Sequence, residues 1–195
     1  GTSVLDVTAP EAVNKVAAEV KARSGAPDIL LNSAGIALLH GATEVSDADW
    51  LKVMDVNIKS NHWLCNLVLP QMLERGDGSI TIISSIGGLK GSAVLGAYAI
   101  SKAADMQLAR NLAVEYGPKG IRANAIAPGL IKTYFAKALW DNDEILKAST
   151  SGSALKRIGI PDEIAGAAVF LASDAGAFMT GQTMTIDGGA TITGG

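Results

Sequence analysis

The sequence predicts an α/β protein with a doubly wound parallel sheet, on the basis of three observations. Short apolar runs alternate along the chain with segments in which apolar residues recur every three or four positions, as in βαβ units. The length of 195 residues is typical of one domain. Hydrophobic residues make up 48% of the chain but aromatic residues only 5%, so small side chains would let helices pack closely on a sheet. We therefore expect residues 1–195 to form a single domain.

The predicted strands are short runs rich in apolar and β-branched residues, bounded by small or turn-forming residues. The apolar run Asp28–Asn32 (DILLN) is typical of a strand that is covered on both faces, as in a parallel sheet. In chain order, the predicted strands are Thr2–Asp6, Asp28–Asn32, Ser79–Ser84, Ile121–Ile126 and Gly181–Asp187.

The predicted helices begin and end at capping residues. Thr8–Glu11 has the pattern of a capping box with a proline near the first helical position, and Gly25 ends this helix. A longer helix is predicted from Ser46 to about Leu73, and it ends at Gly76. The remaining helical segments are Val94–Tyr116, a helix from Pro161 onward, and a mobile helical insert at Lys132–Arg157, where periodicity is weak.

Composition and charge exclude several classes of function. A formal net charge of −3 without a basic stripe argues against nucleic acid or an anionic membrane as a partner. No apolar run reaches the roughly 18 residues that span a bilayer, and the first residues lack the pattern of a signal peptide. The single cysteine, Cys65, forms no internal disulfide, so we expect a reducing, cytoplasmic compartment. Histidine, cysteine and aspartate do not cluster at metal-ligand spacing, so we expect no metal.

Polar and small residues follow several predicted strands at their carboxyl ends. They are Asp6, Asn32, Ser84–Ser85 and Pro128–Gly129. Ligands of open parallel sheets bind outside the carboxyl ends of the strands. The sequence therefore predicts a binding site at this edge of the sheet.

Tyr98 and Lys102 are candidates for proton transfer at this site. Residues at i and i+4 share one face of a helix, so the lysine ammonium can lie beside the tyrosine ring. A phenol has a pKa of about 10, so it is a poor base at neutral pH. A cation about 4 Å away would stabilise the phenolate by roughly 4 kcal/mol at an effective dielectric constant of about 20. We therefore expect Lys102 to lower the pKa of Tyr98, which makes Tyr98 a candidate general acid or base.

With these motifs, the whole chain resembles the short-chain dehydrogenase/reductase family. Several motifs in one order are more specific than any one of them. The matching segments are Leu5–Thr8 (LDVT), Asn32–Gly35 (NSAG), Asn57, Ser85, Tyr98, Lys102, Ile121–Gly129 (IRANAIAPG), Thr133 and Thr180–Gly189 (TGQTMTIDGG).

The resemblance implies a Rossmann-type fold and assigns roles to individual residues. It implies that Tyr98 is the catalytic acid/base, and that Lys102 lowers the pKa of Tyr98 and binds the nicotinamide ribose. It also implies that Ser85 holds the substrate oxygen and that Asn57 anchors a water. Asp6 and the backbone of Val7 would bind adenine, and Thr133 and the backbone of Ile131 would meet the carboxamide. The full set of implied cofactor-binding residues is Asp6, Val7, Asn32, Ala34, Gly35, Tyr98, Lys102, Pro128, Gly129, Ile131 and Thr133.

The sequence departs from the family pattern in two ways. Ser33 stands where the family usually has a second asparagine, and its hydroxyl can still donate and accept a hydrogen bond. No G-x-x-x-G-x-G motif precedes Asp6, so the chain corresponds to the fold from its third strand onward and lacks the residues that choose NAD or NADP. We expect the native protein to be longer by about 50 residues, roughly one βαβ unit and a strand.

The resemblance implies an NAD(P)-dependent oxidoreductase that interconverts an alcohol and a ketone or aldehyde, with the insert at 132–157 covering a small-molecule substrate. The stretch PGLIKTYFAKALW is most similar to carbonyl reductases, which favours NADP over NAD. One alternative is a 3-ketoacyl-carrier-protein reductase, and another is a non-catalytic dinucleotide-binding regulator. Apolar positions on the two long helices, together with the resemblance, imply a homotetramer or homodimer.

Overall fold

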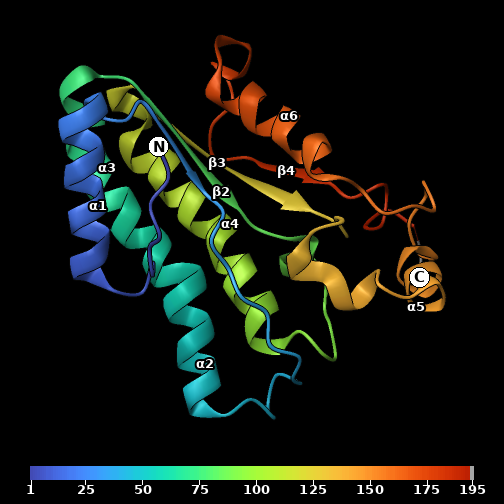
Figure 1. Cartoon of the computed structure of the whole chain (residues 1–195). Helices are drawn as coiled ribbons and strands as arrows, with labels where there is room; N and C mark the ends of the chain where they lie inside the picture. Colours follow the sequence, from blue (N-terminus) through green and yellow to red (C-terminus); the bar gives the residue numbers. More distant parts are fainter. Residues whose placement is uncertain (194–195) are drawn as a thin grey trace.

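A single parallel sheet of four strands, in the order β1-β2-β3-β4, forms the centre of the computed structural model, which describes residues 1–193 (Figure 1). The strands are β1 (Ile29–Asn32), β2 (Gly78–Ile83), β3 (Ile121–Pro128) and β4 (Thr183–Ile186). Consecutive strands pair with each other, so each connection between them is a crossover. The predicted α/β fold with a parallel sheet is confirmed.

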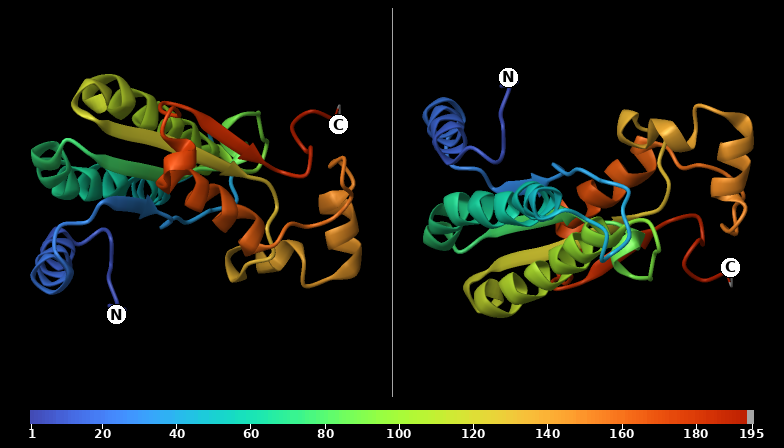
Figure 2. Two further views of the ribbon diagram at one scale, coloured as in Figure 1. Left: turned by 90° about the horizontal axis from the view of Figure 1, so that it is seen from above. Right: turned by 90° about the horizontal axis from the view of Figure 1, so that it is seen from below.

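Helices cover both faces of the sheet, as a doubly wound fold requires (Figure 2). On one face, α3 (Ser60–Arg75) and α4 (Gly96–Tyr116) pack on β2 and β3, and on the other face lies α6 (Pro161–Ala172). Successive side chains of a strand point to opposite faces of the sheet, and those of β3 meet helices on both faces. The alanines at 123, 125 and 127 face α3 and α4, whereas Ile126 faces α6. The small alanine side chains allow α4 to lie close to the sheet.

The helix predicted from residue 46 to residue 73 is present, with one local departure. Ser46 caps its beginning by accepting a hydrogen bond from the Asp49 N–H, and Gly76 ends it at a positive φ of 70°. Between α2 (Asp47–Met54) and α3, residues Asp55–Lys59 form a π-helical turn. Such turns are frequent at functional sites, and this one contains Asn57.

The strand predicted at Thr2–Asp6 does not form. Residues 1–6 have no regular structure and Val4 is fully exposed, because a strand needs a partner and no described strand lies beside this segment. The predicted capping box at Thr8–Glu11 is also wrong: α1 (Pro10–Ser24) has Ala9 at its N-cap, without a side-chain bond. Pro10 does occupy the first turn, as predicted, and Gly25 ends α1.

The segment predicted as a helical insert lies beyond the carboxyl end of β3 (Figure 1). It contains a 3-10 helix at Tyr134–Leu139 and the helix α5 (Asp143–Thr150), and most of its side chains are exposed. At its base, Gly159 bridges to Ile131 by two backbone hydrogen bonds. The other short 3-10 turns are Ile86–Gly88, Gly117–Lys119 and Asp174–Gly176.

Strand β1 forms one edge of the sheet. Two apolar residues of this strand, Ile29 and Leu31, are about half exposed, at 50% and 47%. An apolar sheet edge of this kind is a template for pairing with another segment or chain.

No helix within residues 1–193 is long and apolar enough to cross a membrane.

Candidate active site

Helix α4 brings Tyr98 and Lys102 to the carboxyl ends of the strands, as their spacing predicts. Both side chains are buried, and the Lys102 Nζ lies 5.9 Å from the centroid of the Tyr98 ring. Lys102 donates a hydrogen bond of 2.9 Å to the carbonyl of Ile83, the last residue of β2. The lysine is therefore fixed between α4 and the sheet at the end of β2.

Asn57 joins the site from the π-helical turn. Its amide accepts a hydrogen bond of 2.8 Å from the Ile36 N–H and donates one of 3.0 Å to the Ile36 carbonyl. It also donates to the Ser101 hydroxyl, which in turn donates to the Tyr98 carbonyl. The Asn57 side chain thus ties the backbone of Ile36, in the loop after β1, to the Ser101 hydroxyl on α4.

Sequence reasoning missed two polar residues beneath the lysine. The Asp105 carboxylate forms an ion pair of 3.0 Å with the Lys102 Nζ, and its other oxygen accepts a hydrogen bond of 2.7 Å from the Asn61 amide. Asn61 also donates to the Asn57 carbonyl, which lies one helical turn earlier. The available signal was spacing, because Asp105 lies three residues after Lys102 on a face that is otherwise apolar at Met106 and Ala109.

The expected lowering of the Tyr98 pKa by Lys102 stays a prediction, because the influences observed on this pKa come from burial, Ser85 and Asp105. Burial raises the pKa of Tyr98 above its usual value of 10, an interaction with the Ser85 side chain lowers it, and the negative charge of Asp105 raises it. Tyr98 therefore holds its proton at neutral pH, as a proton donor must.

Ser85 lies on the turn after β2, facing Tyr98. Its hydroxyl accepts a hydrogen bond of 3.0 Å from the Gly87 N–H, and a Cβ added to Gly87 would lie 3.4 Å from this hydroxyl and 3.5 Å from a ring carbon of Tyr98. A Cβ at Gly88 would lie 2.5 Å from the Ala103 nitrogen, so this turn touches the α4 backbone directly. The neighbouring Ser84 is a structural residue, since its hydroxyl donates to the Lys102 carbonyl.

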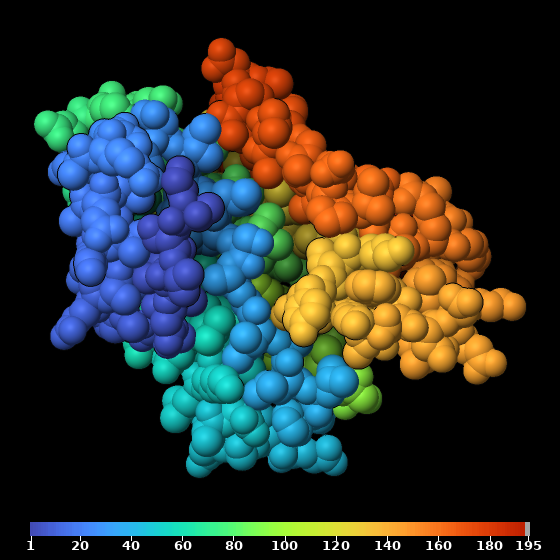
Figure 3. Space-filling view, in the orientation of Figure 1, coloured from blue at the N-terminus to red at the C-terminus, as the bar shows by residue number. Residues whose placement is uncertain are grey.

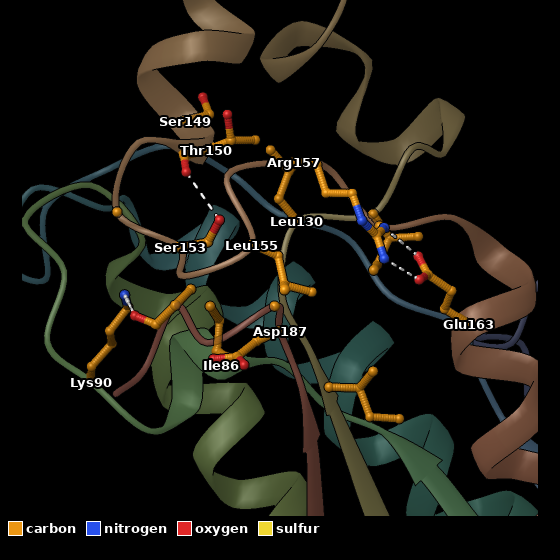
Figure 4. A pocket seen from close by; sticks show the side chains of 16 residues that line it. Ile86, Lys90, Leu130, Ser149, Thr150, Ser153, Leu155, Arg157, Glu163 and Asp187 are labelled. Carbon is orange, nitrogen blue, oxygen red and sulfur yellow. Dashed lines mark hydrogen bonds and ion pairs between the residues drawn. The ribbon is translucent and has the colours of Figure 1, made fainter. Parts of the chain in front are cut away.

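The insert reaches the site through an aromatic contact. The ring of Phe135 lies 6.3 Å from that of Tyr98. A cavity of about 220 Å³ is lined by one predicted residue, Ile131, but not by Ser85, Tyr98 or Lys102 (Figure 4). It is lined by Ile86, next to Ser85, by Leu130, next to Gly129, and by residues of the insert and the C-terminal loop. Figure 3 shows the surface hollowed between the first third of the chain, in blue, and the insert, in orange.

Several predicted cofactor residues have polar groups free for a ligand. The Asn32 Oδ1 is buried without a hydrogen-bond partner in the described chain, while its Nδ2 lies 4.0 Å from the Cys65 sulfur. Gly35 approaches the lysine, since a Cβ there would lie 3.5 Å from the Lys102 Nζ. The Ile131 N–H donates to no residue within 1–193, because the two bonds of its bridge to Gly159 belong to its neighbours. These groups fit the hydroxyl and amide groups of a dinucleotide.

The other predicted cofactor residues have local partners. Gly129 packs against the Asp187 backbone and donates to the Ile186 carbonyl, whereas the Thr133 hydroxyl donates to the Ile131 carbonyl at 3.4 Å. The exposed Asp6 carboxylate accepts two hydrogen bonds from Thr8, and the Thr8 side chain lowers its pKa. Val7, Ala34 and Pro128 are half-buried, as are Gly129 and Thr133.

Comparisons with known proteins agree with this fold. The family model described as enoyl-(acyl carrier protein) reductase matches residues 2–191. Dehydrogenase/reductase SDR family member 4 of Bos taurus is 39% identical over 176 residues, which are 90% of this chain and 63% of the relative. The chain thus spans less than two thirds of the length of that relative.

Two similar solved structures contain a nicotinamide dinucleotide. A gluconate 5-dehydrogenase from Burkholderia cenocepacia, in complex with NADP and tartrate, is 34% identical with a TM-score of 0.91, and the match covers 97% of this chain and 74% of that one. A 4-hydroxyisoleucine dehydrogenase complexed with NADH is 32% identical with a TM-score of 0.91, and the match covers 97% of this chain and 79% of that one. Among residues 1–193, histidine, cysteine and acidic residues form no group that could hold a metal ion.

Proposed function

Because the chain belongs to the short-chain dehydrogenase/reductase family, whose members are oxidoreductases, we propose that it interconverts an alcohol and a ketone or aldehyde with NADP or NAD. The observation that carries this proposal is the meeting of Ser85, Tyr98 and Lys102 at the end of β2. Two hydroxyl groups and a cation at one point are what a reaction that develops negative charge on oxygen needs.

In the proposed reaction, Ser85 and Tyr98 act on the same substrate oxygen. A nicotinamide dinucleotide held at this site would supply the hydride to the carbonyl carbon, or accept it from the alcohol. The Ser85 hydroxyl donates a hydrogen bond to the oxygen, and the Tyr98 hydroxyl transfers its proton to it, which completes the alcohol.

The cofactor would lie along the carboxyl ends of β1, β2 and β3. Lysine has three N–H donors, and Lys102 commits two of them to Ile83 and Asp105, which leaves one for a ribose hydroxyl. The Ile131 N–H and the Thr133 hydroxyl would hold the carboxamide, and Asn32, Ala34 and Gly35 would line the ribose side. The solved relatives hold NADP in one case and NADH in the other, and resemblance to carbonyl reductases favours NADP.

The insert would cover a small-molecule substrate, and it offers only scattered cations to an acyl-carrier protein, the alternative substrate. An acidic carrier needs available cations around the pocket. In the insert, Lys137 pairs with Asp141, Arg157 pairs with Glu163, and Lys132 lies over the Trp140 ring. The other two cations of the insert, Lys147 and Lys156, form no ion pair within residues 1–193, so they are the ones that an acidic carrier could meet. A non-catalytic regulator has no chemical need for Ser85 beside Tyr98.

The test combines cofactor binding with the variant Tyr98→Phe. The purified protein is titrated with NADPH and with NADH by fluorescence, and turnover is measured with small ketones and with an acetoacetyl thioester. We expect Tyr98→Phe to bind the cofactor as the wild type does and to lose turnover by about 10²–10⁴-fold, the usual contribution of a general acid.

The matched control is Tyr134→Phe, an exposed tyrosine of the insert. Binding without turnover in the wild type would support the regulator. Turnover with the thioester alone would support the acyl-carrier alternative, and full activity in Tyr98→Phe would refute the assignment of Tyr98.

A further inference from the structure

The cavity next to Ser85 contains polar groups that the proposed reaction does not use. Its volume is about 220 Å³, which is room for roughly seven waters at about 30 Å³ each, so a molecule that fills it is small. The cavity begins at Ile86, the residue after Ser85, and its walls include the aliphatic side chains of Leu130, Leu155 and Ile186. A substrate whose carbonyl oxygen lies at Ser85 would therefore extend its remaining atoms into this cavity.

Four charged side chains line the cavity, and three of them are already bound within the chain. The Arg157 guanidinium donates two hydrogen bonds to the Glu163 carboxylate, of 2.9 and 2.6 Å. The two oxygens of the Asp187 carboxylate accept hydrogen bonds from the backbone, one of 2.9 Å from the Gly189 N–H and one of 2.7 Å from the Thr191 N–H. These three groups are satisfied without a ligand.

Lys90 is the fourth of these charged groups, and within residues 1–193 it is the one cation of the cavity outside an ion pair. Its side chain is exposed, and among the described residues its ammonium donates one long hydrogen bond, of 3.4 Å, to the Ala190 carbonyl. A lysine has three N–H donors, so two remain for a ligand. In Figure 4, Lys90 lies on the opposite side of the cavity from the pair of Arg157 and Glu163.

The turn between Ser85 and Lys90 is held by its own backbone. The Gly88 N–H donates to the Ser85 carbonyl and the Leu89 N–H donates to the Ile86 carbonyl, both at 3.0 Å. The backbone of Lys90 therefore has a fixed position relative to the Ser85 hydroxyl. A group fixed in this way selects a substrate by the separation between its reacting carbonyl and a second, recognised group.

The chemistry of Lys90 determines which group it would recognise. An ammonium has donors and no acceptor, so its ligand must supply lone pairs. Two buried hydroxyl groups of the wall, on Thr150 and Ser153, already donate to the carbonyls of Leu146 and Thr150, so they do not compete as donors. A hydrogen bond between an ammonium and a carboxylate is about twice as strong as one between neutral groups. A carboxylate is therefore the ligand that Lys90 would bind best.

Building on the proposed function, we propose that Lys90 is a specificity-determining residue and that the substrate is a short oxo acid or the corresponding hydroxy acid, whose carboxylate binds the Lys90 ammonium. The carbonyl would lie at Ser85 and Tyr98, and the carbon chain would lie between Ile86 and Leu155. In reduction, the carbonyl carbon takes the hydride of the nicotinamide dinucleotide, the oxygen takes the Tyr98 proton, and the carboxylate is unchanged. The cavity volume limits the substrate to roughly four to six carbon atoms.

The test compares each oxo acid with its amide, which has nearly the same size and shape but no charge. Reduction of 4-oxopentanoate and 4-oxopentanamide, and of 5-oxohexanoate and 5-oxohexanamide, is measured with NADPH and with NADH in the wild type and in Lys90→Met. We expect the wild type to prefer the acids. Lys90→Met should lower kcat/KM for the acids by on the order of tenfold and leave the amides unchanged, since it removes one charge-assisted contact. The loss should lie in KM, because Lys90 binds a part of the substrate that does not react.

Two further variants separate charge from structure. Lys90→Arg keeps a cation at this position and should keep the preference for the acids. Lys147→Met removes a cation of α5 that does not line the cavity, and it should leave the ratio of acid to amide turnover unchanged. A ratio that is the same in the wild type and in Lys90→Met would overturn the proposal, even where both substrates lose activity. A lysine that only held the Ala190 carbonyl would affect both substrates alike.

Binding is measured separately, so that failure of this inference differs from failure of the proposed function. The wild type and Lys90→Met are titrated by calorimetry with 4-oxopentanoate and with 4-oxopentanamide, in the presence and in the absence of NADP. Preferential binding of the acid that is lost in Lys90→Met, without turnover in the wild type, would refute the proposed function and leave the carboxylate site. Turnover of neutral ketones without any preference for the acids would keep the proposed function and overturn the role of Lys90. Absence of both binding and turnover would overturn both.

Discussion

The two sides of the candidate site are built in opposite ways. On the side of α4, the Lys102–Asp105 pair is buried, and it shares a network with Asn57 and Asn61. On the side of the insert, the ion pairs of Lys137 with Asp141 and of Arg157 with Glu163 are largely exposed. The backbone around α4 is also closely packed, whereas most insert side chains lie at the surface.

This difference separates two tasks. The α4 side holds the groups that would act on the reacting oxygen, and such groups need a fixed geometry. The insert would shape the space around the rest of the substrate, and exposed loops tolerate the sequence changes that alter a pocket. Changes on the α4 side should therefore cost both stability and activity, while changes on the insert side should have small effects on stability.

The largest effect is expected from Lys102→Met. This change leaves the Asp105 carboxylate buried without its cation, and we expect the free energy of unfolding to fall by about 3–5 kcal/mol. Urea unfolding monitored by circular dichroism measures it. The matched variant on the insert, Lys137→Met, breaks an exposed pair and should cost less than about 1 kcal/mol. Equal losses in the two variants would show that the comparison between buried and exposed sides does not hold.

A smaller effect is expected from Gly88→Ala. The new Cβ would lie 2.5 Å from the Ala103 nitrogen and 2.6 Å from the Lys102 carbonyl carbon, so the turn that carries Ser85 must move away from α4. We expect a loss of about 1–3 kcal/mol in stability together with a fall in kcat, because Ser85 and Tyr98 move apart. The control is Gly91→Ala, where the added Cβ meets no atom within 4 Å. A Gly88→Ala protein as stable and active as Gly91→Ala would show that this contact is loose.

The smallest effect is expected from Glu163→Gln in the first turn of α6, whose partner Arg157 lies at the end of the insert. The Arg157 guanidinium holds the pKa of Glu163 at about 2, against an ordinary value of 4.5. The folded-state pKa is lowered, so the stabilisation by this pair is present above pH 4.5 and disappears as the pH falls toward 2. Melting temperatures of the wild type and Glu163→Gln should differ slightly at pH 7 and converge on acidification, whereas Glu19→Gln, on α1, should show no such convergence. A difference that is constant with pH would exclude the ion pair as its cause.

Local sequence signals predicted most of the elements. Apolar runs identified β1, β2, β3 and β4, and Ser46, Gly25 and Gly76 marked the ends of helices because their chemistry acts within one turn. The strand predicted at Thr2–Asp6 failed for the opposite reason. A strand forms by hydrogen bonding to a neighbour, and composition does not show whether a neighbour is present.

The sequence by itself determined the fold class and the family, because periodicity and the order of motifs can be read along the chain, and the family resemblance implied which residues would meet the substrate oxygen. Only the tertiary structure decided how the charges balance around Tyr98. The i+4 spacing predicts the neighbourhood of Lys102, but the effect of that cation depends on burial and on Asp105, Asn61 and Asn57 around it. Electrostatic energies depend on the distance to every nearby charge and on the exclusion of water, and both are set only when distant segments pack together.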